Sequence, residues 1–194
     1  MSYSFIPNFL SILRIVLSVF FILFMYFDTP FFKFLSLLTF FICSLSDFFD
    51  GYIARKYKFQ TVFGTYLDPI ADKVLILSAF ITLHFFYPEF IKIWMIASIV
   101  LRDLIVTGLR FKILRSGHVM KTSYFSKLKT LFQIILIHII LFLHYFNSDL
   151  IFSASIFSFN LVYFLTAFCV LYVIFSGIHY IIINSKYLNE AWYQ

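Results

Sequence analysis

The sequence predicts an all-α integral membrane protein with six transmembrane helices and a polar metal and substrate cavity at their cytoplasmic end. Three observations lead to this fold class. Hydrophobic residues make up 62% of the 194 residues, and the mean hydropathy is +0.96, which is outside the range of soluble globular chains. The apolar residues form six runs, each close to the roughly 20 residues that a helix needs to cross a bilayer. The few charged residues gather near one side of these runs.

The predicted spans follow one another with short polar breaks between them. The first break contains Asp28-Thr29-Pro30 and the third contains Pro88-Glu89, whereas basic stretches at 56–63 and 112–123 form the second and fourth. The six spans cover residues 8–27, 31–55, 69–87, 90–110, 124–146 and 160–184. Since no internal repeat or soluble segment interrupts them, we expect a single membrane domain over residues 1–194.

The basic residues predict the orientation of the spans. With six alternating spans, both termini and the loops near residues 60 and 115 lie on one side. Thirteen of the fifteen Lys and Arg residues lie in these loops or in the adjoining helix halves, and only Lys33 and Lys92 lie toward the other side. Because cytoplasmic loops are rich in Lys and Arg, both termini are predicted to be cytoplasmic. Positive loops facing anionic lipid explain the net charge of +6 better than nucleic-acid binding does.

Four aspartates, Asp47, Asp50, Asp68 and Asp72, fall within 26 residues of a chain that has nine acidic residues in total. The spacings i, i+3 and i, i+4 place each pair on one helix face, and a short loop can bring the two pairs together. Four neighbouring carboxylates do not all stay ionised in a low-dielectric site without cations. Oxygen ligands select a hard divalent ion such as Mg²⁺ or Mn²⁺, and Mg²⁺ commonly also binds substrate phosphates. The cluster therefore predicts a metal site and a phosphate-bearing substrate.

Small residues beside the aspartates support a substrate site. Gly51, Ala54 and Gly64 leave room for a nucleotide or pyrophosphate, and Arg55 can pair with phosphate oxygens. The alternative is a solvated belt at the membrane surface, in which the aspartates pair with neighbouring basic residues. Such a belt requires neither glycines nor fixed spacing, so we favour the substrate site.

The chain resembles the CDP-alcohol phosphotransferases through the pattern Asp47-x2-Asp50-Gly51-x2-Ala54-Arg55-x8-Gly64-x3-Asp68-x3-Asp72. The resemblance implies a six-helix membrane enzyme, usually a homodimer, that moves a phosphatidyl or similar group from a CDP-linked donor to an alcohol. It implies that the four aspartates hold two metal ions and that Asp72 also deprotonates the acceptor hydroxyl. The residues implied to line the CDP site are Gly51, Ala54, Arg55 and Gly64, with Asn8 and Ser11 of the opening IPNFLSILR within reach of the nucleotide.

Two later segments, 99–110 and 123–133, resemble the bacterial phosphatidylglycerophosphate synthase branch of this family. They depart from its usual pattern at Asp103, where Glu is usual, and at Ser126, where Gly is usual. This resemblance implies CDP-diacylglycerol as donor, sn-glycerol 3-phosphate as acceptor and the bacterial inner membrane as location.

The residues alone also point to an anionic acceptor. Arg102, Arg110 and Lys127 are expected near one membrane level, and intramembrane cations are costly unless they are paired. A phosphate monoester would give the three cations a common partner. The alternative is that Arg102 pairs only with Asp103, while Lys127 extends to the membrane surface.

Two other functions stay open at this point. Another member of the family would use inositol phosphate, serine or phosphatidylglycerol as acceptor, although serine would leave the three cations unexplained. A divalent-cation transporter would use the aspartates as an ion site. Transport requires a polar path across the whole membrane, whereas the far halves of the spans carry little charge besides Lys33 and Lys92.

Overall fold

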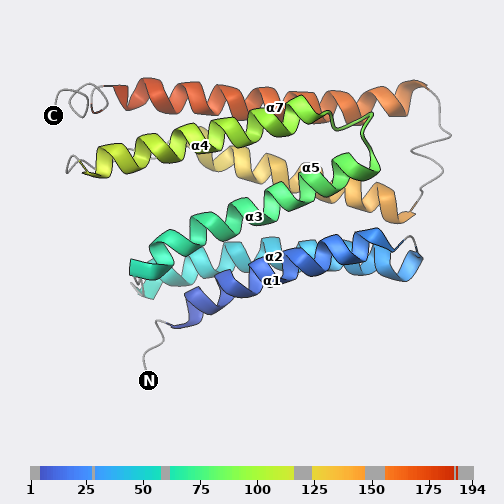
Figure 1. The fold of residues 1–194 in the computed structure, drawn as a ribbon, viewed down its shortest axis with the longest axis horizontal. Coiled ribbons are helices and arrows are strands. Elements are labelled where there is room, and N and C mark those ends of the chain that lie inside the picture. Colours follow the sequence, from blue (N-terminus) through green and yellow to red (C-terminus); the bar gives the residue numbers. More distant parts are fainter. Residues whose placement is uncertain are drawn as a thin grey trace.

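The computed structural model shows long helices that run up and down in a bundle (Figure 1). It describes residues 5–27, 29–57, 62–115, 124–146, 156–185 and 187, and the side chains of 9–27, 29–46, 70–113, 124–146, 162–185 and 187. The helices are α1 (Phe5–Tyr26), α2 (Pro30–Tyr57), α3 (Val62–Phe86), α4 (Ile93–Arg115), α5 (Tyr124–Phe146) and α7 (Ile156–Ile183). Throughout this part of the chain the regular structure is helical, which confirms the predicted all-α class.

The bundle consists of two halves of three helices each. Helix α1 packs against α2 and α3, and α7 packs against α4 and α5. The halves meet where α2 contacts α5, with sparser contacts of α3 to α4 and α5. We call this boundary the seam. Helix α1 begins and α7 ends at the same end of the bundle, on the left in Figure 1, where α2 and α4 end and α3 and α5 begin. The alternating order therefore brings the most charged segments of the described chain to one end, which we call the charged end.

An apolar core fills the bundle, and the outer faces are also apolar. Phe21, Phe40 and Phe80, from α1, α2 and α3, have no exposed surface. Outward-facing side chains are just as hydrophobic, since Phe85 is 76% exposed and Leu104 is 64% exposed. A protein in water does not carry such faces on all its helices. The outer surface is therefore suited to lipid.

Three helices are long and apolar enough to cross a membrane, among the residues that the structure describes. These stretches are Phe9–Tyr26, Tyr124–Phe146 and Val162–Ile183, and α2 adds a shorter apolar stretch, Pro30–Ser46. Helix α4 differs because its first 18 residues include three charges. Length and composition thus confirm three of the six predicted spans, and the other three stay predictions.

Helix α3 begins earlier than the sequence analysis predicts. The span was predicted from residue 69, whereas α3 begins at Val62 and contains Pro69 within it. Hydropathy reports the apolar part of a helix and not its polar first turns, and Pro is favoured at the start of a helix. Both effects place the predicted boundary too late. The first turns of α3 extend the helix to the charged end.

The turn between α3 and α4 also shifts a predicted boundary, from residue 90 to Ile93. The backbone N–H groups of Phe90 and Ile91 both donate to the Tyr87 carbonyl, each at 3.1 Å. The ring Nδ1 of His84 lies 2.5 Å from the Ile91 carbonyl oxygen. These bonds hold residues 87–92 in a compact turn, so α4 starts only after it.

Candidate active site

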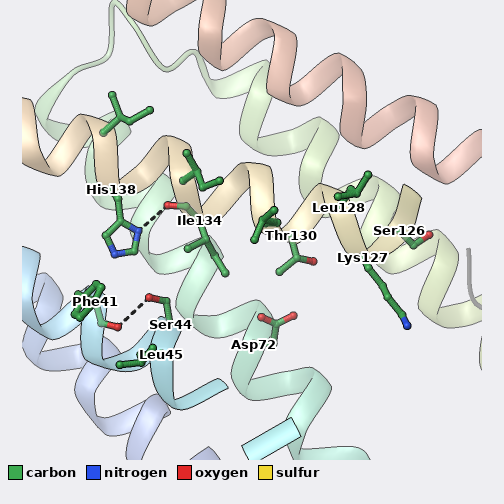
Figure 2. Close-up of a pocket in the computed structure, with 13 residues that line it drawn as sticks. Phe41, Ser44, Leu45, Asp72, Ser126, Lys127, Leu128, Thr130, Ile134 and His138 are labelled. Atoms are coloured by element: carbon green, nitrogen blue, oxygen red, sulfur yellow. Dashed lines mark hydrogen bonds between the residues drawn. The ribbon is translucent and has the colours of Figure 1, made fainter. Parts of the chain in front are cut away.

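An open groove lies along the seam between α2 and α5 (Figure 2). Its volume is about 860 Å³. Apolar side chains of α5, among them Leu131, Ile134 and Ile135, line its length. Asp72 and Lys127 lie at one end of the groove, and His138 and Phe41 lie at the other. The groove therefore joins a polar end to a long apolar surface, an arrangement that suits an amphipathic ligand.

A second cavity, of about 400 Å³, lies among α3, α4, α5 and α7. Four of its lining side chains carry a positive charge, namely Lys73, Arg102, Arg110 and Lys129. Two lining side chains, Asp72 and Asp103, carry a negative charge. The lining is thus net positive by two charges, which suits a dianionic ligand.

Asp72 lines both the groove and the cavity. Its helix, α3, contacts α4 and α5 of the other half at the seam, so this one residue borders both spaces. Ser126 and Thr130 of α5 line both spaces as well. A carboxylate at such a junction can accept a proton from a group in one space while that group reacts with a ligand in the other.

Arg102 is held by groups from three helices. The side chain is 9% exposed, and its Nη1 donates to Asp103 Oδ1 at 2.9 Å. Its Nη2 donates to Ser176 Oγ on α7 at 3.1 Å and approaches Ser126 Oγ on α5 at 3.4 Å. Arg102 therefore pairs with Asp103, but not with Asp103 alone as the alternative proposed, and it forms part of the cavity wall.

Asp103 also binds a second cation. Lys129 Nζ donates to the same Oδ1 atom at 2.5 Å, and both side chains are nearly buried. One carboxylate thus joins α4 to α5 through two positive groups. Nearby, Lys73 Nζ donates to Thr107 Oγ1 at 2.5 Å and ties α3 to α4. These bonds hold three of the four positive groups of the cavity, Lys73, Arg102 and Lys129, in place without a ligand.

The structure brings three of the residues predicted from sequence into one cavity: Asp72, Arg102 and Arg110. Lys127 is exposed and lines the groove, so it does not share the cavity with the two arginines. Ser11 is fully buried on α1. The other predicted site residues lie on helices but outside the described side chains: Asn8 on α1, Asp47, Asp50, Gly51, Ala54 and Arg55 on α2, and Gly64 and Asp68 on α3.

The sequence analysis missed Lys73 and Lys129 as cavity residues. Lys127 and Lys129 are two residues apart, or about 200° around a helix, so they face opposite sides of α5. Choosing between them requires knowing which side of α5 meets α4. One signal of the surroundings of Arg102 was available in the sequence. The two departures from the family pattern, Asp103 and Ser126, both contact Arg102.

The helical register of α2 and α3 fits a metal site at the charged end. Asp47 lies ten residues before the end of α2, and Asp72 lies ten residues after the start of α3. Asp50 lies seven residues before the end of α2, and Asp68 lies six residues after the start of α3. At 1.5 Å per residue, the members of each pair are within about 2 Å of the same height along antiparallel helices. Among described side chains there is no group of three metal-ligating residues, and Asp72 is the one predicted ligand among them.

Comparison with known proteins gives a consistent family. The sequence profile of the CDP-alcohol phosphatidyltransferase family matches residues 4–173. The chain is similar to proteins named CDP-diacylglycerol–glycerol-3-phosphate 3-phosphatidyltransferase from three bacteria. The Haemophilus influenzae protein is 37% identical over 136 residues, covering 67% of this chain and 71% of the relative. The Bacillus subtilis protein is 41% identical over 102 residues, covering 53% and 52%. The Escherichia coli K12 protein is 32% identical over 132 residues, covering 67% and 72%.

The two lysines of α5 provide a test of the pairing. We expect Lys129→Met to lower the free energy of unfolding by on the order of 2–3 kcal/mol, because it removes one partner of a nearly buried ion pair while Arg102 remains beside Asp103. Lys127→Met, two residues away on the exposed side, should change it by less than about 0.5 kcal/mol. Thermal or denaturant unfolding of both variants in the same detergent measures the difference. Equal stability losses would contradict the pairing described above.

Proposed function

Because the chain belongs to the CDP-alcohol phosphatidyltransferase family, we propose that it transfers the phosphatidyl group of CDP-diacylglycerol to sn-glycerol 3-phosphate, giving phosphatidylglycerophosphate and CMP. The observation that carries this proposal is the position of Asp72, which lines both an apolar groove and a net positive cavity. A lipid donor and a phosphorylated acceptor need two such spaces meeting at one reacting group. The names of the bacterial relatives support the same donor and acceptor.

The groove is the proposed donor site. Its apolar length along α5 matches acyl chains that reach it from the membrane, since apolar surface binds apolar chains in proportion to the area buried. The CDP headgroup would then lie at the charged end, near Asp72 and Lys127. The residues that we propose to contact the nucleotide there belong to α1, α2 and α3: Asn8, Ser11, Gly51, Ala54, Arg55 and Gly64.

The cavity is the proposed acceptor site. A phosphate monoester carries nearly two negative charges at neutral pH, which equals the excess of positive charge in the lining. Arg102 and Arg110 would contact the phosphate, with Lys129 of α5 also in the lining. Serine has no net charge at neutral pH and would leave this excess uncompensated, so the cavity favours a phosphorylated alcohol. Lys127, which was grouped with the arginines from sequence, fits the donor side instead.

Asp72 is the proposed general base. A base must lie within hydrogen-bond reach of the proton that it removes, and Asp72 borders the space where the acceptor hydroxyl would enter. The hydroxyl oxygen then attacks the phosphorus of the phosphatidyl group, and the bond from that phosphorus to the CMP oxygen breaks. The proton passes to Asp72, and CMP leaves with the bonding electrons. One new phosphodiester replaces one cleaved pyrophosphate bond.

We propose that Asp47, Asp50, Asp68 and Asp72 hold two divalent ions, Mg²⁺ or Mn²⁺. The matching heights of the two aspartate pairs along α2 and α3 support this assignment. Carboxylate oxygens are the ligands that these ions prefer. When bound, the ions would neutralise the pyrophosphate and stabilise the attacking and leaving oxygens.

The proposed location is the inner membrane of a bacterial cell, where residues 1–194 form one membrane domain with six spans and a homodimer assembles. Cytoplasmic termini would place the charged end toward the water-soluble acceptor.

The orientation is tested with a Thr61→Cys variant. Its new cysteine should be inaccessible to a membrane-impermeant maleimide in intact cells. The native Cys43 and Cys169 are buried and should give little background labelling. Efficient labelling from outside would contradict the orientation, and a monomeric mass by light scattering in detergent would contradict the dimer.

The reaction is tested with purified protein, CDP-diacylglycerol, Mg²⁺ and a panel of alcohols: sn-glycerol 3-phosphate, inositol phosphate, serine and phosphatidylglycerol. We expect phosphatidylglycerophosphate as the main lipid product.

Variants of the aspartates test the metal and base assignments in the same assay. Asp72→Asn should lower kcat by at least about a hundredfold, since it removes a general base. Asp47→Asn or Asp68→Asn should abolish turnover in folded protein. A different preferred alcohol would overturn the acceptor, and undiminished activity of the aspartate variants would overturn the metal and base assignments.

The two spaces predict separate kinetic effects. Arg110→Ala should raise KM for sn-glycerol 3-phosphate by about tenfold. One charge-assisted contact contributes about 1.5–3 kcal/mol, and we expect the low end of this range because the Arg110 side chain is exposed. KM for CDP-diacylglycerol should stay near the wild-type value. Arg55→Ala, in the proposed nucleotide site, should have the reverse effect. Steady-state kinetics with each substrate varied in turn measures both values; an equal rise of both KM values in Arg110→Ala would refute the division into two sites.

A further inference from the structure

Helix α7 carries a glycine where it meets Arg102. Gly177 is buried inside the helix, and glycine is a poor helix former, so a glycine there indicates a packing requirement. A Cβ atom at this position would lie 2.8 Å from Arg102 Cγ and 3.2 Å from Arg102 Nε. The first distance is shorter than real Cβ contacts. The stem of Arg102 thus occupies the space that any other residue at 177 would need.

The preceding residue, Ser176, contacts the other end of the same side chain. Its hydroxyl donates to the Val173 carbonyl oxygen at 2.7 Å. Because the hydroxyl proton is used in this bond, the oxygen is free to accept from Arg102 Nη2, which lies 3.1 Å away. Ser176 is fully buried, so this contact is shielded from water. Two successive residues of α7 therefore contact the stem and the head of Arg102.

Arg102 cannot easily swing away from an added methyl group. The clash falls on Cγ and Nε, which lie along the stem. The guanidinium beyond them is fixed by Asp103 as well as by Ser176. A side chain held at its head and crowded at its stem must shift as a whole. A methyl group at 177 would therefore move the guanidinium relative to the cavity.

We infer that Ser176 and Gly177 form a cradle on α7 that positions Arg102 for the acceptor phosphate, so that the last helix sets the affinity for the acceptor. This inference rests on the function proposed above. Both residues lie beyond residue 173, where the match to the family profile ends. Their role is that of positioning residues, since they act through Arg102 and lie on the side of α7 that meets α4.

The test compares matched pairs of variants. Gly177→Ala is paired with Gly108→Ala, because a Cβ at Gly108 on α4 would meet nothing within 4 Å. Ser176→Ala is paired with Ser36→Ala, because the buried Ser36 makes the same bond to the carbonyl three residues before it, at 2.8 Å. Each purified variant is assayed for the rise in Tm caused by sn-glycerol 3-phosphate, and for KM of each substrate.

We expect Gly177→Ala to raise KM for sn-glycerol 3-phosphate by about tenfold or more and to reduce the ligand-induced rise in Tm. Ser176→Ala, which removes one oxygen and adds no volume, should raise this KM by about three- to tenfold. KM for CDP-diacylglycerol should stay unchanged in both, and the two controls should match wild type. If Gly177→Ala does not fold, Ser176→Ala decides the question.

The inference is overturned if the acceptor KM of Ser176→Ala equals that of Ser36→Ala, or if both substrates are affected equally. Failure of the proposed function gives a different result. Wild-type protein that binds sn-glycerol 3-phosphate without forming phosphatidylglycerophosphate would refute the reaction, and the Tm comparison would still decide the cradle. Wild-type protein that does not bind this phosphate would refute both.

Discussion

Charge placed inside a membrane bundle has to be paired, and this constraint shapes the half formed by α4, α5 and α7, beside the seam. Arg102, Lys129 and Asp103 form one bonded group that draws on α4 and α5, and Ser176 adds a contact from α7. Water cannot solvate such groups once the helices pack, so each bond offsets part of a desolvation cost. The cavity that this group borders has more positive than negative side chains in its lining. Such an excess favours an anionic ligand, as the proposed function requires.

The same seam separates two kinds of ligand. The groove opens along apolar α5 side chains, where a lipid can enter sideways, while the cavity is bounded by cations at the charged end. A reaction between a membrane-bound donor and a water-soluble acceptor needs both routes to end at one place. Asp72 lies at that place because α3 belongs to one half and contacts the other. Under the proposed function, the reaction therefore takes place at the boundary between the two halves.

Much of this arrangement could be predicted from the sequence, because hydropathy and charge repeat along the chain. The apolar runs predicted the helices and their order, and the basic residues predicted a charged end. The pattern around Asp47 and Asp72 predicted the family. Helix starts were less predictable: α3 begins at Val62 because polar residues also form helix. Hydropathy alone does not distinguish such a polar first turn from a loop.

The side chains of the cavity could be predicted only in part. Spacing on α4 correctly associated Arg102 with Arg110, since both lie on one helix. The partner from α5 depended on how α5 is rotated against α4, which a single sequence does not reveal, and so Lys127 was chosen instead of Lys129. A glycine inside a helix indicates close packing, but the sequence does not identify the partner of Gly177, which is a side chain 75 residues earlier.

Equilibrium binding to the Asp72→Asn protein shows whether two separate sites meet at Asp72. With turnover removed, binding of sn-glycerol 3-phosphate is measured by titration in the presence of Mg²⁺, with and without saturating CDP-diacylglycerol. If the sites are separate, both ligands bind at once, one of each per chain, with less than about a threefold change in the Kd of sn-glycerol 3-phosphate. Mutual displacement of the two ligands would show that they share one site and would contradict the account.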